Sequence, residues 1–243
     1  MTIRQLAGTT AVVTGASRGF GRGIAVSLVE RGAHVVGVAR NQDLLSELKV
    51  RLGDAFTPEV GDVADPSLAA RLISQYRPKT LVLNAGATPA VARLQDQTWE
   101  NFSTNWNVDV HQIFSFTGEA LRTPLDPGSV VVSLSSGAAL RGSPLSGGYA
   151  GAKATIKFIS AYAGSEAERN GADVRFVAVL PQLTPATDLG RLYTEAYSGS
   201  SVAPAGPALS VEEASTSISD LVVNDDYVAS AYLLTAAGLQ ALQ

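Results

Sequence analysis

The chain has 243 residues, of which 46% are hydrophobic and 16% charged, and its formal net charge is −4. This length and composition suit a globular chain with a sizeable core, so we expect a single domain over residues 1–243. The charge balance gives no sign of a nucleic-acid or anionic-membrane surface, which needs clustered Lys and Arg. The chain contains no cysteine, so disulfides, thiolate metal sites and cysteine nucleophiles are excluded.

The N-terminal stretch is not typical of a signal peptide, because its apolar piece, AVV at 11–13, is short and glycines follow at once. No apolar run approaches the roughly 20 residues that span a bilayer. The two histidines, His34 and His111, are far from metal-ligand spacing. We therefore expect a cytoplasmic protein with no membrane partner and no metal site.

Short β-branched runs alternate with helical stretches along the chain. The predicted strands are 10–15, 34–40, 56–63, 80–86, 129–136, 174–181 and 227–234, and the predicted helices are 20–31, 42–52, 66–76, 97–121 and 149–169. Runs of Val and Leu bounded by Gly, Pro or Asp are typical of parallel strands covered on both faces. The alternation predicts a doubly wound α/β fold of the Rossmann type, with about seven parallel strands and helices on both faces.

The least regular part of the chain is 182–210, which is rich in Pro, Ser, Ala and Thr. We expect this lid segment to shape the substrate pocket, with a mobile loop at 198–210. Its apolar and aromatic side chains favour an apolar or aromatic substrate, although they could equally pack on the body of the protein. These side chains are Leu183, Leu189, Leu192, Tyr193 and Tyr197.

A glycine-rich turn follows the first predicted strand and opens the first helix. Gly15, Gly19 and Gly21 let the backbone turn sharply and approach a pyrophosphate, while the helix N-terminus offers free N–H groups. An ordinary strand-to-helix turn is the alternative interpretation. The strand before it and the helix after it favour a dinucleotide site.

The end of the second predicted strand distinguishes the two nicotinamide dinucleotides. A site for NAD usually has Asp or Glu there, to bind the ribose 2′-hydroxyl, whereas this chain has Ala39 and Arg40. Arg18 stands within the glycine turn, and two guanidinium groups together fit a 2′-phosphate. We therefore expect NADP(H) to be preferred over NAD(H), unless one of these arginines is only a surface charge.

Polar residues follow two further strands. Asp62 could accept a hydrogen bond from the adenine amino group, or it could only shape a turn. Asn84, Ala85 and Gly86 offer a bare backbone that a cofactor can approach, and their alternative is a simple turn.

A possible catalytic group of residues lies near the start of the helix at 149–169. Tyr149 and Lys153 are four residues apart and share one helix face, so the ammonium could lower the pKa of the phenol. Such a tyrosine can donate a proton to a developing alkoxide, and the Ser136 hydroxyl could bind the same oxygen. Taken alone, the Tyr–Lys pair could be an ordinary pair on the helix surface.

Taken together, TGASRGFG, GDV, LNAG, NVDV and YAGAK, with a serine thirteen residues before the tyrosine, occur here in a specific order. On these motifs the chain resembles the short-chain dehydrogenase/reductase family over essentially its whole length. The resemblance implies catalysis by Ser136, Tyr149 and Lys153, with Asn107 of NVDV binding a water that relays protons to the lysine. It implies hydride transfer between NADP(H) and a ketone or aldehyde, with Tyr149 as the general acid or base.

The same resemblance extends the predicted cofactor site and implies a homodimer or homotetramer. The expected cofactor-binding residues are Gly15, Ser17, Arg18, Gly19, Phe20, Gly21, Arg40, Asp62, Val63, Asn84, Ala85, Gly86, Tyr149, Lys153, Pro181 and Thr184. Gln182 stands where the family usually has glycine, and either Thr184 or Thr187 could meet the nicotinamide. The alternative to an enzyme is a non-catalytic NADP(H)-binding sensor, which the retention of all four catalytic residues disfavours.

Overall fold

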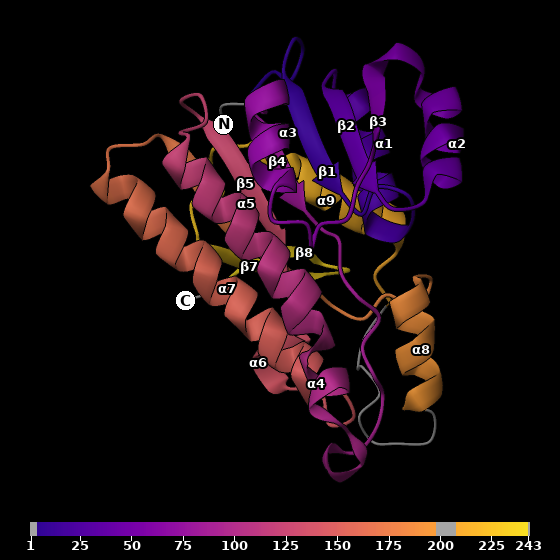
Figure 1. The fold of residues 1–243 in the computed structure, drawn as a ribbon. Helices are drawn as coiled ribbons and strands as arrows, with labels where there is room; N and C mark the ends of the chain where they lie inside the picture. Colours follow the sequence, from indigo (N-terminus) through magenta and orange to yellow (C-terminus); the bar gives the residue numbers. More distant parts are fainter. Residues whose placement is uncertain (1–3, 198–207, 243) are drawn as a thin grey trace.

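The computed structural model describes residues 4–197 and 208–242, which form one eight-stranded sheet with helices on both faces (Figure 1). The strand order is β3-β2-β1-β4-β5-β6-β7-β8. The strands are β1 Thr10–Thr14, β2 His34–Ala39, β3 Phe56–Val60, β4 Thr80–Leu83, β5 Ser129–Leu134, β6 Val174–Pro181, β7 Ala231–Thr235 and β8 Gly238–Ala241. The first seven pair in parallel, which confirms the predicted doubly wound sheet.

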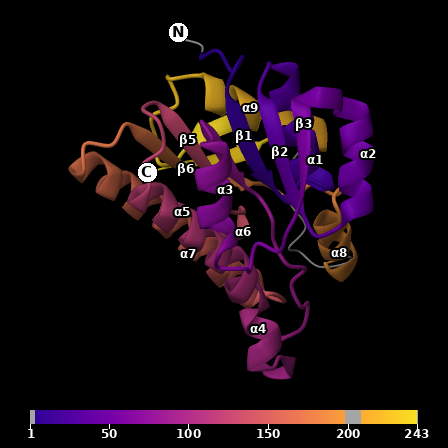
Figure 2. The ribbon, with the colours of Figure 1, turned by 45° about the horizontal axis from the view of Figure 1, so that its top comes forward.

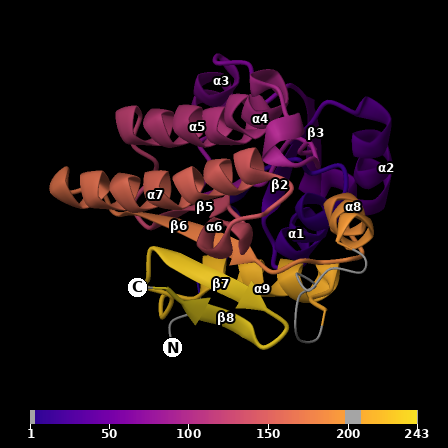
Figure 3. The same cartoon turned by 90° about the horizontal axis from the view of Figure 1, so that it is seen from below.

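The helices form two layers, one on each side of the sheet, seen from below in Figure 3. One face of the sheet carries α1 Gly19–Glu30, α2 Gln42–Leu52 and α9 Val211–Val223, and the other carries α3 Leu68–Tyr76, α5 His111–Arg122 and α7 Gly147–Arg169. Three further helices lie at one end of the sheet: α4 Trp99–Asn105, α6 Ala138–Arg141 and α8 Asp188–Ala196.

Two apolar clusters hold these layers to the sheet. Val13 of β1 joins the cluster that contains Leu28 of α1, and its neighbour Val12 joins the cluster that contains Phe116 of α5. Successive side chains of a strand point to opposite faces, so a continuous run of buried Val supplies both clusters. Each fully buried Val, Leu or Phe contributes on the order of 1.5–3 kcal/mol.

The structure departs from the predicted elements in several places, and β3 and β4 end three residues earlier than predicted. The helix predicted at 97–121 is α4, a π-helical turn over Trp106–Val110, and α5. The late strand begins at residue 231 rather than 227, β8 adds an antiparallel edge strand, and α9 fills 211–223. The mobile loop predicted at 198–210 lies mostly outside the described residues, and Ser210 caps α9.

The strand order reverses between β1 and β4, whose connections run to opposite sides of the sheet. In open α/β sheets, ligands bind in the crevice that such a reversal leaves at the carboxyl ends of the strands. No helix within residues 4–197 and 208–242 is long and apolar enough to cross a membrane.

Candidate active site

A cavity of about 1360 Å³ opens at the carboxyl ends of the strands. This volume exceeds a typical site for one small ligand and leaves room for a dinucleotide and a substrate. Nearly all the predicted site residues line it, namely Gly15, Ser17, Arg18, Gly19, Phe20, Arg40, Asp62, Val63, Asn84, Ala85, Gly86, Ser136, Tyr149, Lys153, Pro181 and Thr184. Gly21 and Asn107 are not among the lining residues.

The glycine turn has the backbone that a phosphate cradle requires. Gly15 and Gly19 have φ angles of +67° and +52°, in the left-handed region that favours glycine. Gly21 packs directly against the turn, and a Cβ at this position would collide with the Gly15 carbonyl. Arg18 is the N-cap of α1 and its side chain makes no capping hydrogen bond, so the first N–H groups of the helix are available to a pyrophosphate.

The two arginines that were predicted to bind a 2′-phosphate both line the cavity and are exposed. Arg40 follows the last residue of β2. Arg18 already has a partner, since its Nη1 lies 2.8 Å from Oδ2 of Asp188 at the start of α8. Asp188 also pairs with Arg191. Figure 2 shows α8 beyond the end of the sheet where α1 begins, so this ion pair connects the glycine turn to the lid segment.

The residues after β3 and β4 have structural partners as well as cavity positions. Oδ1 of Asp62 accepts a hydrogen bond from the Ala64 N–H at 3.0 Å. Asp62 therefore shapes the turn after β3 and also lines the cavity. The Asn84 backbone N–H donates to Thr14 Oγ1 at 2.9 Å, and its side-chain amide donates to the Thr14 carbonyl at 3.1 Å. Asn84 therefore connects the ends of β4 and β1, where the strand order reverses.

Ser136, Tyr149 and Lys153 come together at one wall of the cavity. Ser136 lies two residues beyond β5, and its Oγ accepts a hydrogen bond from the Ala138 N–H at 3.2 Å. Tyr149 and Lys153 lie on the first turns of α7 with 6% and 5% of their surface exposed. The Lys153 Nζ is 5.6 Å from the centre of the Tyr149 ring. The helix face predicted from the spacing of these two residues is therefore turned into the cavity.

The pKa of Tyr149 lies above the usual value of a phenol, opposite to the direction expected from a nearby lysine. Burial is the main cause of the raised pKa, because desolvation penalises the phenolate. A hydrogen bond with the Ser136 side chain lowers the pKa, and the negative charge of Asp109 raises it further. Tyr149 therefore carries its proton at neutral pH in this structure.

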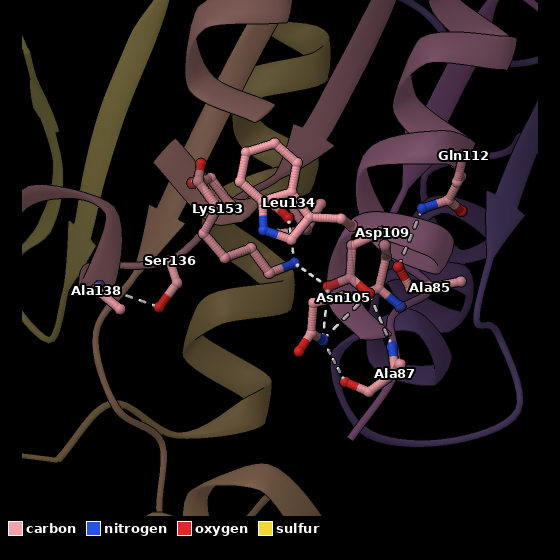
Figure 4. Close-up of polar contacts among 12 residues, drawn as sticks. Ala85, Ala87, Asn105, Asp109, Gln112, Leu134, Ser136, Ala138 and Lys153 are labelled. Carbon is pink, nitrogen blue, oxygen red and sulfur yellow. Dashed lines mark hydrogen bonds and ion pairs between the residues drawn. The ribbon is translucent and has the colours of Figure 1, made fainter. Parts of the chain in front are cut away.

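Asn107 of the NVDV motif does not line the cavity that Lys153 lines. It lines a small separate cavity with His111 and Phe114, and its amide lies 3.4 Å from Ser103 Oγ. Asp109 instead faces the lysine, with Oδ2 3.1 Å from Lys153 Nζ (Figure 4). Residues two apart on a helix point to nearly opposite sides, so the π-helical turn can present only one of them to the cavity.

The segment after β6 also departs from the family pattern. Gln182 stands where the family usually has glycine, and its backbone N–H donates to the Leu234 carbonyl of β7 at 2.9 Å. Gln182 also lines the cavity. Thr187 is the N-cap of α8 and accepts a hydrogen bond from the Gly190 N–H at 2.9 Å. Thr184 is buried and lines the cavity. The Thr184 hydroxyl donates to the Gln182 carbonyl at 3.3 Å and Thr187 lines the cavity as well, so both threonines lie at the cavity with a partner in their own segment.

The described part of the lid segment, residues 182–197, contributes two aromatic rings to the lining of the cavity. Tyr193 lies against Tyr149 at 5.9 Å between ring centres and stacks on Tyr197 at the same distance. The Tyr193 hydroxyl hydrogen-bonds Ser146 Oγ at 2.5 Å. Leu183 and Leu189 line the cavity too, whereas Leu192 does not. Four of the five side chains named from the sequence therefore face the candidate substrate space.

Comparison with known families supplies the identification. The family described as short chain dehydrogenase matches residues 9–197, which is most of the chain. The chain belongs to the short-chain dehydrogenase/reductase family. This is a family of oxidoreductases, and the match covers the glycine turn and all the residues of the Ser136–Tyr149–Lys153 group.

Several curated proteins are similar to this member of the family. Versicolorin reductase 1 of Aspergillus parasiticus is 31% identical over 161 residues, covering 63% of this chain and 61% of that protein. Serine 3-dehydrogenase of Rhizobium radiobacter is 28% identical, covering 71% and 70%, respectively. The match spans about three fifths of the length of versicolorin reductase 1.

Solved structures show the same fold. A serine dehydrogenase complexed with NADP⁺ gives a TM-score of 0.81 at 20% identity, covering 96% of this chain and 99% of the other. A 3-ketoacyl-(acyl-carrier-protein) reductase from Brucella melitensis complexed with NADH gives 0.78 at 21% identity, covering 93% and 96%. At this identity the likeness concerns the fold alone.

Proposed function

We propose that this short-chain dehydrogenase/reductase is an NADP(H)-dependent oxidoreductase that reduces a ketone or aldehyde to an alcohol, or runs the reverse reaction. The observation that carries the proposal is the gathering of Ser136, Tyr149 and Lys153 at one wall of a cavity large enough for a dinucleotide. From the family resemblance we also propose a homodimer or homotetramer, and from the N-terminal sequence a cytoplasmic location.

The residues present fit the cofactor. Left-handed Gly15 and Gly19 and the open N-terminus of α1 suit a pyrophosphate, and Arg18 and Arg40 suit a 2′-phosphate. No carboxylate directly follows β2 to favour the ribose 2′-hydroxyl of NAD(H). When bound, the nicotinamide supplies or accepts the hydride.

The protein's own residues supply the proton and the orientation. The Ser136 hydroxyl donates a hydrogen bond to the substrate carbonyl oxygen, and Tyr149 gives its proton to that oxygen as the alcohol forms. Burial keeps Tyr149 protonated, as a general acid requires. The aromatic lid residues Tyr193 and Tyr197 favour an apolar or aromatic substrate.

The test is the oxidation of NADPH against a panel of aromatic and aliphatic ketones, aldehydes and quinones, with NADH in parallel. We expect turnover with NADPH well above that with NADH. Binding of NADPH without turnover on any carbonyl compound would contradict the proposed reaction and favour a sensor.

The preference for NADP(H) is tested separately with Arg40→Asp. We expect it to weaken NADPH binding by about tenfold to a hundredfold, since a hydrogen bond between charged groups contributes about 1.5–3 kcal/mol. NADH binding should change little. Arg51→Asp, an exposed arginine of α2 that does not line the cavity, is the matched control. An unchanged NADPH/NADH ratio in Arg40→Asp would contradict the assignment.

A further inference from the structure

Asp109 forms a buried ion pair with the candidate catalytic lysine. Its side chain is 1% exposed and that of Lys153 is 7% exposed. The Lys153 ammonium has three N–H groups, of which one faces Asp109 Oδ2 at 3.1 Å and one donates to the Leu134 carbonyl at 3.0 Å. Two of its three donors are thus fixed, and Lys153 still lines the cavity with the remaining one.

The carboxylate is held on its other side by the segment after β4. Asp109 Oδ1 accepts a hydrogen bond from the Ala87 N–H at 2.8 Å. The Asn105 amide lies 3.4 Å from both carboxylate oxygens and donates to the Ala87 carbonyl at 2.8 Å (Figure 4). Gly86 permits this approach, because a Cβ there would lie 2.9 Å from Asp109 Oδ2.

These contacts hold the Asp109 carboxylate between Lys153 of α7 and the backbone of the Ala85–Ala87 segment. We propose that Asp109 is a positioning residue, which fastens the Lys153 ammonium to the Ala85–Ala87 segment and offsets its positive charge at Tyr149. The proposal rests on the function proposed above. It also assigns to Asp109 the place beside the lysine that the NVDV motif assigned to Asn107.

The charge of Asp109, and not only its shape, matters here. An asparagine would keep the size of the side chain and an oxygen to accept from Lys153, but it would leave the ammonium uncompensated in a buried place. The titratable groups of α7 that Asp109 faces are Lys153 and Tyr149, while Asn105 of α4 and Gln112 of α5 are uncharged. His111, two residues along, lines the separate small cavity.

The consequence concerns the pH range of the reaction. With Asp109 ionised, Tyr149 stays protonated to higher pH, so carbonyl reduction, which consumes that proton, persists into alkaline solution. Without the negative charge, the ammonium stabilises the phenolate. Alcohol oxidation, which needs the phenolate, then begins at lower pH.

The experiment compares the pH profile of kcat in both directions for the wild-type protein and Asp109→Asn. In Asp109→Asn we expect two changes. The pH at which kcat for carbonyl reduction falls should be lower, and the pH at which kcat for alcohol oxidation rises should be lower too. Asp96→Asn, the same change in an exposed carboxylate paired with Arg93, is the control and should not move them. A profile that is unchanged in Asp109→Asn, or moved by Asn107→Ala instead, would overturn the proposal.

A second measurement, which does not depend on turnover, separates the role of Asp109 from the proposed oxidoreductase function. The ionisation of Tyr149 is followed by ultraviolet difference absorbance, with Tyr149→Phe subtracted, and should shift to lower pH in Asp109→Asn. If the wild-type protein lacks oxidoreductase activity but this shift occurs, only the proposed function fails. If the wild-type protein is active and neither readout shifts, only the role of Asp109 fails.

A double variant covers the case in which Asp109→Asn folds poorly. An unpaired buried ammonium should lower the midpoint of thermal unfolding, and Lys153→Met added to Asp109→Asn should recover part of that loss. Without recovery, Asp109 does not act through Lys153 and the proposal is overturned.

Discussion

At the scale of single residues, the site depends on groups whose surroundings change their ordinary properties. Tyr149 is a phenol whose burial raises its pKa, and Asp109 is a carboxylate buried beside a lysine. The family resemblance pointed to Ser136, Tyr149 and Lys153, and all three line one cavity. The role of Asp109 could not, because the spacing in NVDV does not reveal where the helix widens into a π turn.

Gly21 allows a prediction at this scale. A Cβ at this position would collide with the Gly15 carbonyl and the Asn84 amide, so Gly21→Ala must displace the phosphate cradle. We expect it to lower the free energy of unfolding by about 1–3 kcal/mol and to weaken NADPH binding. Chemical denaturation and a binding titration measure both effects.

Gly164 of α7 is the matched control for that substitution. A Cβ there would point into open space, with no neighbouring atom within 4 Å, so Gly164→Ala should be neutral or stabilising by roughly 0.5–1 kcal/mol. Equal effects at the two glycines would contradict the packing argument.

Among the helices and strands, the seven parallel strands could be predicted from the sequence, whereas β8 and α9 were not. β-Branched runs such as Val130–Val132 are typical of a buried strand, and this run pairs with β4 in the sheet. β8, Gly238–Ala241, has no β-branched residue, and its pairing with β7 depends on a hairpin that the sequence signals only by a glycine. α9 is rich in serine, although Ser210 and Glu213 form a capping box that could have marked its start.

The ion pair between Arg18 and Asp188 connects two elements that meet at the candidate phosphate site. Asp188→Asn should free Arg18 for a 2′-phosphate while loosening the start of α8. Because both side chains are more than half exposed, we expect only a few-fold gain in NADPH affinity, larger at low salt. NADH affinity should not rise. A fall in NADPH affinity would show that Asp188 supports the site rather than competes for Arg18.

At the scale of the whole molecule, one sheet aligns residues from distant parts of the sequence at its carboxyl edge. Asn84 follows β4, Ser136 follows β5 and Pro181 ends β6, and all three line one cavity. The fold class and this edge follow from strand–helix alternation. The placement of the lid helix α8 over the cavity depends on tertiary contacts, such as the hydrogen bond of Tyr193 with Ser146, that no local pattern encodes.

Two buried phenols, Tyr149 and Tyr193, and the partly buried phenol of Tyr76 should make the folded molecule sensitive to alkali. Burial and a hydrogen bond to Glu59 raise the pKa of Tyr76 to about 12, and burial also raises the pKa of Tyr149 and Tyr193. The unfolded chain releases these protons near pH 10 and the folded chain does not. The contribution of these phenols to the free energy of unfolding should therefore be complete below about pH 10. The free energy of unfolding should fall as the pH rises above that value.

Urea unfolding at a series of alkaline pH values measures this slope. Tyr76→Phe, which removes one of the three phenols, should make the fall shallower. A free energy of unfolding that stays constant or rises over the same pH range would contradict the burial of these groups.

We propose that Tyr149 supplies the proton in an NADPH-dependent carbonyl reduction, and the turnover of Tyr149→Phe with the best carbonyl substrate tests this role. We expect a loss of about a hundredfold to ten-thousandfold in kcat, with NADPH binding nearly intact. Tyr162→Phe, an exposed tyrosine on the same helix, should keep wild-type turnover. Wild-type turnover in Tyr149→Phe would show that another group supplies the proton.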